Sequence, residues 1–188
     1  MKKKTIIILS IVAVVVIALA FAISSYNNLV SAEQEVNEKE STISVMLTRR
    51  ADLIPNLVNT VKGYAAHEEG IYTDLANARA KLAGSTGTDE KLEANAQLDS
   101  ALSRLLVVVE NYPELKASQQ FIALQDQLEG AESRISTARV DYNAAVKKYN
   151  IKIRRFPTNI LANLFGFEAK ALYEAPEGST QTPNVNFE

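Results

Sequence analysis

The densest mixture of charged, apolar and helix-breaking residues in the sequence lies between Thr48 and His67. Arg50 and Glu68 fall on a face of a predicted helix that is otherwise mostly apolar. An unpaired charge in such a place is very costly. Each charge must therefore be paired within the chain, extend its stem to water, or be held for a binding partner. The first two interpretations need only the chain itself, whereas the third predicts a binding site.

Asp52 and Asn56 are four residues apart and share another face of the same predicted helix, with Arg49 and Lys62 nearby. The simplest interpretation is a set of surface pairs worth ~0.2–0.5 kcal/mol each. The alternative is a contact surface for a partner protein.

Pro55 lies inside this helix and cannot donate a hydrogen bond to residue 51. We expect it to bend the helix and to free a backbone carbonyl, which Asn56 or Arg50 could satisfy.

Glu132 and Arg139 stand seven residues apart on a later predicted helix, so they share one face of it. From phase alone we predict that Glu132 pairs with Arg50 and that Arg139 pairs with Glu68. The candidate interaction motif consists of Arg49, Arg50, Asp52, Pro55, Asn56, Tyr64, Glu68, Glu132 and Arg139.

No enzyme motif is complete. His67-Glu68 begins like the H-E-x-x-H zinc helix, but Ile71 stands where the second histidine ligand belongs, and the chain has one histidine and no cysteine. The segment from Gly84 to Thr88 lacks the lysine of a phosphate-binding loop, and no G-x-S-x-G sequence presents a serine. We therefore predict a protein that is not an enzyme and that has no cofactor and no metal site.

The elements that must position these residues begin with a membrane segment. After the basic residues 1–4, Ile6 to Ile23 form an 18-residue run without a charge. At ~1.5 Å per residue this run spans roughly 27 Å, enough to cross a bilayer core. We predict an anchor over residues 5–24. A cleaved signal peptide is the alternative, because 18–20 and 20–22 both have small residues at the spacing of a cleavage site.

Charge indicates the orientation and the partners. Lys2, Lys3 and Lys4 precede the apolar run, and Glu33 and Glu35 follow it, which favours a cytoplasmic N-terminus and an extracytoplasmic bundle. Removing the three lysines from the 20 basic residues leaves 17, against 22 acidic residues. A balance of this sign argues against nucleic acid as a partner.

A 3–4 repeat then predicts one long helix from Leu29 to Leu82 with coiled-coil-like packing. Gly63 and Gly70 lie inside it and cost ~1 kcal/mol each, which suggests a second surface close by. The repeat consists of Leu29, Glu33, Val36, Glu40, Ile43, Leu47, Arg50, Ile54, Leu57, Val61, Tyr64, Glu68, Ile71, Leu75, Ala78 and Leu82.

Three further helices are predicted. A turn at 84–87 and an N-cap at Thr88 begin the second helix, which runs to about Glu110. Pro113 begins a third helix that ends near Ile153, and 159–165 form a short fourth helix. A single helix over 88–151, bent at Pro113, is the alternative. The composition of 174–188 predicts a disordered tail.

Many of these residues resemble the bacterial LemA family, over nearly everything from the membrane segment to Tyr173. Ala131 departs from the threonine that is common in the family. The matching segments are Tyr26-Asn27, Arg49-Arg50-x-Asp52-Leu-Ile-Pro-Asn-Leu-Val58, Val61-Lys-Gly-Tyr64, His67-Glu68, Glu110-Asn-Tyr-Pro-Glu-Leu-Lys-Ala117, Glu132-x-Arg134-Ile, Ala138-Arg139, Tyr142-Asn143, Tyr149-Asn150, Phe156-Pro157 and Phe165-Gly-Phe167.

The resemblance implies a single-pass membrane protein with an up-and-down four-helix bundle over 25–173. It implies no established catalytic activity. Genes of the family often lie near genes of membrane proteases or other envelope proteins, which suggests that the family members act as partners of such proteins. We expect a membrane-anchored scaffold of the bacterial envelope that associates with itself or with an envelope protein. A regulatory adaptor for a membrane protease or another envelope enzyme is the alternative. Because the predicted first helix is far longer than the second, its 29–47 repeat is expected to need a partner outside the chain.

Overall fold

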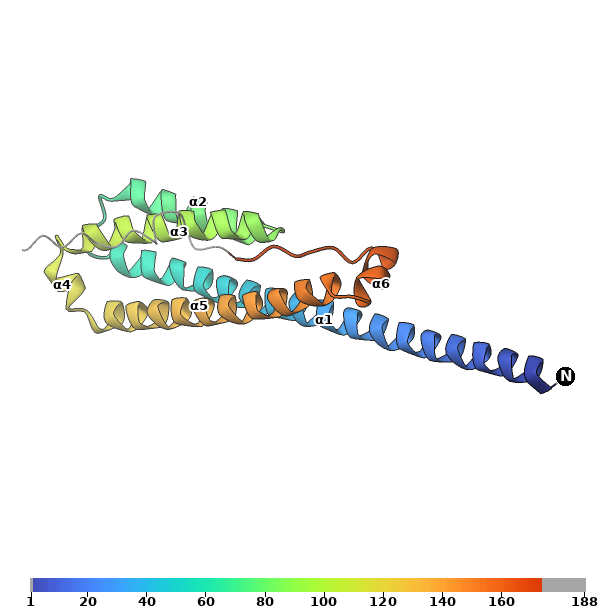
Figure 1. The fold of residues 1–188 in the computed structure, drawn as a ribbon. Coiled ribbons are helices and arrows are strands. Elements are labelled where there is room, and N and C mark those ends of the chain that lie inside the picture. The colour runs from blue at the N-terminus through green and yellow to red at the C-terminus, as the bar shows by residue number, and fades with distance from the viewer. Residues whose placement is uncertain (1, 174–188) are drawn as a thin grey trace, which may run out of the picture. The chain divides into compact units, whose positions relative to one another are not determined.

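The computed structural model describes residues 2–173, which form six helices and no strand (Figure 1). The predicted all-α class is therefore confirmed, whereas the tail predicted at 174–188 lies outside the described residues. The helices are α1 (Lys2–Lys62), α2 (Glu69–Gly84), α3 (Thr88–Val109), α4 (Pro113–Lys116), α5 (Gln119–Arg154) and α6 (Thr158–Phe165). Two compact units divide the described chain, the first with residues 2–39 and 141–172, the second with 40–140 and Tyr173. α1 and α5 contribute residues to both.

The second unit is an up-and-down bundle of α1, α2, α3 and α5, in agreement with the predicted bundle class. α2 runs antiparallel to α1, because Tyr72 contacts Lys62 at the end of α1 and the later Arg79 contacts the earlier Ala51. α3 then runs antiparallel to α2, and α5 antiparallel to α3. The ion pairs that show these directions include Lys81–Glu93 and Arg104–Asp74 between α2 and α3, and Arg50–Asp99 and Arg50–Glu132 from α1 to α3 and α5.

The core of the second unit follows the 3–4 repeat. Side chains with less than 2% exposure come from all four long helices, and each contributes about 1.5–3 kcal/mol by leaving water. They include Ile43, Ile54, Leu57, Leu75, Leu98, Leu105, Phe121 and Ile135. The short α4 adds Leu115, which is fully buried.

The single helix predicted from Leu29 to Leu82 is wrong, because α1 ends at Lys62 and α2 begins at Glu69. The backbone turns at this point, where the N–H groups of Tyr64 and Ala65 both donate to the Val61 carbonyl. α2 then folds back on α1. Gly63 therefore lies in the connection after α1, and Gly70 lies in the first turn of α2. A Cβ at Gly70 would have open space around it and a Cβ at Gly63 would meet only the Thr60 carbonyl oxygen, so in the described chain no second surface comes close to either glycine.

The second half of the chain also differs in detail. The third helix predicted from Pro113 is instead the four-residue α4 followed by α5, which begins at Gln119. The single bent helix over 88–151 is wrong, because α3 and α5 are separate and face the same part of α1. α3 begins at Thr88 with Gly87 in the N-cap position, one residue before the predicted cap.

The 29–47 repeat does not need a partner outside the chain, contrary to prediction. Leu29 and Val36 are buried in the first unit, and Ile43 and Leu47 are buried in the second, each with at most 3% exposure. α5 is 36 residues long, much longer than α3, and supplies the missing cover. In the first unit, Lys148 of α5 pairs with Glu35 of α1 at 2.9 Å, beside the buried α5 residues Tyr142, Val146 and Tyr149.

The first part of α1 is different, because nothing in the described chain covers it. Every large apolar side chain from Ile6 to Ile23 is between 48% and 69% exposed. By length and composition α1 can cross a membrane. An apolar surface of this length is not stable in water, and the rest of the described chain does not cover it. It needs an apolar environment such as the core of a lipid bilayer.

Candidate functional site

Arg50 lies at the centre of a polar cluster inside the bundle of the second unit. Its side chain is only 8% exposed, and its guanidinium nitrogens meet two carboxylates from different helices. Nη2 lies 2.6 Å from Oδ1 of Asp99 on α3, and Nη1 lies 2.7 Å from Oε2 of Glu132 on α5. The pair between Arg50 and Glu132 is the one that phase predicted, and it is confirmed.

Asn95 of α3 completes this cluster. It is 2% exposed, its side-chain oxygen accepts a hydrogen bond from Arg50 Nη1 at 3.2 Å, and its amide nitrogen donates to Asp99 at 3.0 Å. The buried guanidinium therefore has two charged partners and one neutral partner. Since a buried cation without partners costs several kcal/mol, the two carboxylates make the position of Arg50 in the core possible.

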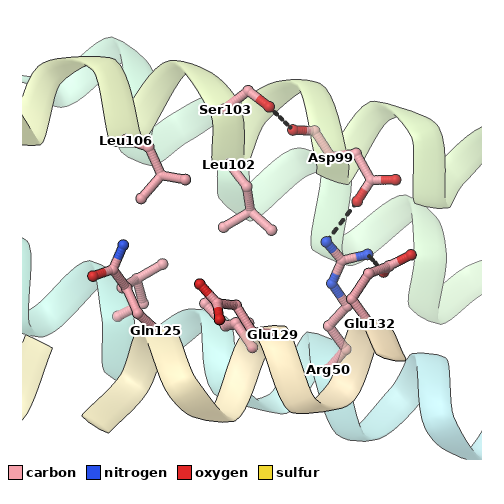
Figure 2. A pocket seen from close by; sticks show the side chains of 10 residues that line it. Arg50, Asp99, Leu102, Ser103, Leu106, Gln125, Glu129 and Glu132 are labelled. Carbon is pink, nitrogen blue, oxygen red and sulfur yellow. Dashed lines mark hydrogen bonds and ion pairs between the residues drawn. The ribbon is translucent and has the colours of Figure 1, made fainter. Parts of the chain in front are cut away.

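A pocket of about 220 Å³ opens beside this cluster, between α1, α3 and α5 (Figure 2). Arg50 with the two carboxylates lies at one end, Leu106 and Gln125 lie at the other end, and Glu129 lies between them. The lining residues are Arg50, Leu57, Asp99, Leu102, Ser103, Leu106, Gln125, Leu128, Glu129 and Glu132.

The charges around the pocket do not balance. Asp99, Glu129 and Glu132 face a single cation, Arg50, so the lining has two more acidic groups than basic ones. Glu129 is exposed at the rim, and the structure gives it no ion pair within residues 2–173. Chemically, a pocket with an apolar wall and an acidic rim suits an aliphatic chain that ends in a positive charge.

The predicted pair between Glu68 and Arg139 is absent from the described structure, and the prediction is wrong. α5 runs antiparallel to α1, so residue numbers on α5 must fall as those on α1 rise. A partner of a residue beyond Arg50 must therefore precede Glu132, whereas Arg139 follows it. Glu68 also lies beyond the end of α1, beside Tyr72, whose pKa is raised by burial first and then by the Glu68 charge.

Pro55 frees a backbone carbonyl, as expected, but neither Asn56 nor Arg50 satisfies it. α1 continues through Pro55, and the carbonyl of Ala51 accepts a hydrogen bond from Nε of Arg79 on α2 at 3.1 Å. The same guanidinium lies 3.7 Å from Asp52, so this carboxylate pairs with α2 and not along its own helix.

The remaining motif residues lie on the surface of the second unit. Arg49, Pro55 and Asn56 are exposed, and Tyr64 is 46% exposed. Asn56 and Tyr64 line a shallow groove between α1 and the start of α5, away from the Arg50 pocket. The motif of nine residues is thus not one site: Arg50 and Glu132 come together, and the others do not join them.

The sequence reasoning missed two residues of the Arg50 cluster, Asn95 and Asp99, and also Arg79, which binds the Ala51 carbonyl outside that cluster. Asn95 and Asp99 are four apart on α3, the spacing of a polar pair on one helix face, and Asn95 interrupts an apolar face. That signal was available. Nothing comparable marks Arg79, because its role depends on α2 folding back along α1.

Among the described residues, no group of three or more His, Asp or Glu side chains is placed to hold a metal ion. An all-helical bundle that continues into an exposed apolar helix of membrane-spanning length defines a membrane-associated helical protein. Within that class, the chain belongs to the LemA family, which it matches over residues 39–187. The resemblance seen in the sequence is thereby confirmed.

Individual relatives match most of the chain. Magnetosome protein MamQ 2 of Paramagnetospirillum magneticum is 32% identical over 200 residues, which cover 92% of this chain and 72% of the relative. Magnetosome protein MamQ of Magnetospirillum gryphiswaldense is 28% identical, with 85% and 70% covered. Protein LemA of Metamycoplasma hominis is 26% identical, with 80% and 69% covered. None of these three names is the name of an enzyme.

Proposed function

We propose that this protein is a non-enzymatic scaffold of the bacterial envelope, anchored by residues 5–24 with its N-terminus in the cytoplasm and its bundle outside. The observation that carries the proposal is the continuity of α1, which runs from the exposed apolar segment into the bundle without a break. A protein built in this way tethers a helical bundle to the membrane.

The orientation has a direct test because the chain contains no cysteine. Single cysteines at Lys4 and at the exposed Ser136 of α5 would be treated with a membrane-impermeant maleimide in intact spheroplasts. We expect Ser136→Cys to be labelled in intact spheroplasts and Lys4→Cys only after lysis. The reverse pattern, or release of the Ser136→Cys bundle into the soluble fraction after cleavage near residue 20, would contradict the proposed topology or anchor.

The Arg50 pocket supports a second, sharper candidate: an adaptor that binds a basic, partly aliphatic side chain of an envelope enzyme such as a membrane protease. The excess of two acidic groups around an apolar wall favours such a ligand. Arg50 itself is a poor reporter of binding, because it is buried and paired, so its replacement would disturb the fold. Glu129 is the better choice, since it is exposed and lines the pocket.

The two candidates separate in one crosslinking experiment on the full-length protein in membranes. A photo-reactive amino acid at Leu106, which lines the pocket and is 41% exposed, is compared with one at Val107, which is 69% exposed and does not line it. Capture of one identified envelope protein at 106 and not at 107 favours the adaptor. Capture of a second copy of this chain favours a self-assembling scaffold. Capture of nothing at either position contradicts both.

Glu129→Gln then tests the electrostatic part of the adaptor candidate, with Asp126→Asn as the matched control. Both residues are exposed acids on α5, but only Glu129 lines the pocket. We expect Glu129→Gln to reduce capture at Leu106 and Asp126→Asn to leave it unchanged. Equal effects of the two variants would show that general charge, and not the pocket, governs capture.

A further inference from the structure

α6 is an apolar helix with an exposed apolar face. Ile160 is 58% exposed and Leu164 is 73% exposed, while Ala162 between them is 1% exposed. At 100° per residue, Ile160 and Leu164 lie on the side of α6 opposite Ala162, so the helix is held to the first unit by one side and presents the other outward. Phe156, four residues before Ile160, is 77% exposed. Exposed apolar residues gathered in this way mark a site of interaction.

The attachment of α6 places this surface next to the apolar part of α1. The ring of Phe165 lies 4.9 Å from that of Tyr26, and the ring of Phe167 lies 5.9 Å from it, both in edge-to-face geometry. Gly166 allows the turn between the two phenylalanines, because it adopts a left-handed conformation with φ of 74° that ends α6.

Tyr26 follows Ile23, the last residue of the apolar run, by three positions, or ~4.5 Å along the helix axis. The polar layer on each side of a bilayer core is roughly 5–7 Å thick. If the apolar run fills the core, the aromatic contact between Tyr26 and α6 therefore falls within the headgroup layer. Aromatic side chains are enriched at that depth.

Basic residues accompany the apolar face. Lys152, Arg154 and Arg155 stand at the end of α5, directly before Phe156, and Arg154 and Arg155 are exposed. Short helices bind anionic membrane surfaces through this combination: apolar side chains insert among the lipids, and neighbouring basic side chains contact the phosphates. The position of this surface beside the end of the membrane segment favours lipid as its occupant over a soluble protein.

We infer that α6, together with Phe156, is a second membrane contact, which lies in the headgroup layer of the leaflet where α1 leaves the bilayer. Phe156, Ile160 and Leu164 insert among the lipids, and Arg154 and Arg155 meet anionic headgroups. The inference rests on the proposed anchor, because the depth of α6 is set by the position of the apolar run. It adds a second attachment that limits the tilt of the first unit on the membrane.

The test uses full-length protein in vesicles of phosphatidylcholine and phosphatidylglycerol, with one fluorescent label on a single introduced cysteine. The informative variant is Leu164→Cys. Ala144→Cys is the matched control, an exposed site in the first unit that lies ~15 Å from the end of α5 at Arg154. Quenching by nitroxide-labelled lipids is compared with quenching by aqueous iodide.

We expect lipid nitroxides to quench the label at 164 several-fold more than the label at 144, and iodide to show the opposite order. Equal quenching at the two sites, or strong iodide quenching at 164, would overturn the inference and leave the surface for a protein partner. A third variant, Ala13→Cys, reports on the anchor alone. A label at 13 inside the bilayer with a label at 164 in water refutes the role of α6 only, whereas a label at 13 in water refutes the anchor itself.

The contribution of the basic residues is tested separately. In vesicles of phosphatidylcholine alone, or with Arg154→Gln and Arg155→Gln, the lipid quenching at 164 should fall. If it is unchanged in both cases, the basic residues do not meet anionic headgroups and that part of the inference is wrong.

Discussion

The two carboxylates that hold Arg50 are expected to be partly redundant. Asp99 and Glu132 are 42% and 43% exposed, so solvent screens each of them and each single ion pair should contribute about 0.5–1 kcal/mol. Asp99→Asn or Glu132→Gln alone leaves the guanidinium with one anionic partner. Both together leave a side chain that is only 8% exposed without any counter-charge, a loss on the order of 3 kcal/mol.

The double variant should therefore cost more than the sum of the two single variants, by roughly 1–2 kcal/mol. The measurement is equilibrium urea unfolding of the full-length protein in detergent micelles, followed by far-ultraviolet circular dichroism. The apolar part of α1 stays in the micelle and adds a constant signal. Glu93→Gln is the control, because it breaks an exposed pair with Lys81 and should change the unfolding free energy by less than about 0.5 kcal/mol.

Additive single effects, within about 0.5 kcal/mol, would refute the reasoning. They would mean that water already compensates the Arg50 charge and that its burial carries no electrostatic cost. A control variant as damaging as Asp99→Asn would point to the same conclusion.

Three further predictions use the same unfolding measurement. Arg79→Ala should lower the free energy of unfolding by about 1 kcal/mol, since it leaves the Ala51 carbonyl, which Pro55 frees, without a donor. In a Pro55→Ala background this loss should be smaller, and an unchanged loss would contradict the role of Arg79. The hydrogen bond from Lys148 lowers the pKa of Glu35 below its ordinary value of 4.5, so its stabilising effect is present above pH 4.5 and is lost as the pH falls through the lowered pKa. Wild type should therefore lose stability more steeply than Glu35→Gln below that pH, and parallel curves would contradict the shift. Gly166→Ala should cost about 1–2 kcal/mol because of its positive φ and Gly166→Asn less, whereas two neutral variants would argue against the left-handed turn.

The buried face of α1 could be predicted from the sequence because it depends only on local periodicity. Leu29, Ile43, Ile54 and Leu57 all proved to be buried, since any helix with this repeat turns the same residues to one side. The break after Lys62 could not be predicted in this way. A second amphipathic helix has the same 3–4 period as the first, so the pattern continued through a connection that reverses the chain direction.

The pair between Arg50 and Glu132 was predictable for the same reason, because Arg50 interrupts the apolar face of one helix and Glu132 lies directly beside the apolar face of another. Its third partner, Asp99, was not, because the position of α3 depends on where α2 begins. The incorrect pair between Glu68 and Arg139 shows what helical periodicity cannot predict. Periodicity tells which residues share a face of a helix, but the direction of the neighbouring helix decides which of them meet.

The cluster around Arg50 also has an evolutionary consequence. Loss of Arg50 first would leave two carboxylates facing each other, and loss of both carboxylates first would strand a buried cation. The order of substitutions that keeps the fold stable is loss of one carboxylate first and then exchange of Arg50 for an apolar side chain such as methionine. The remaining acidic residue can then be substituted without leaving a buried charge unpaired. Relatives that lack an arginine at this position should therefore rarely retain both acids, so the three positions are expected to change as a linked set along the branches of the family tree.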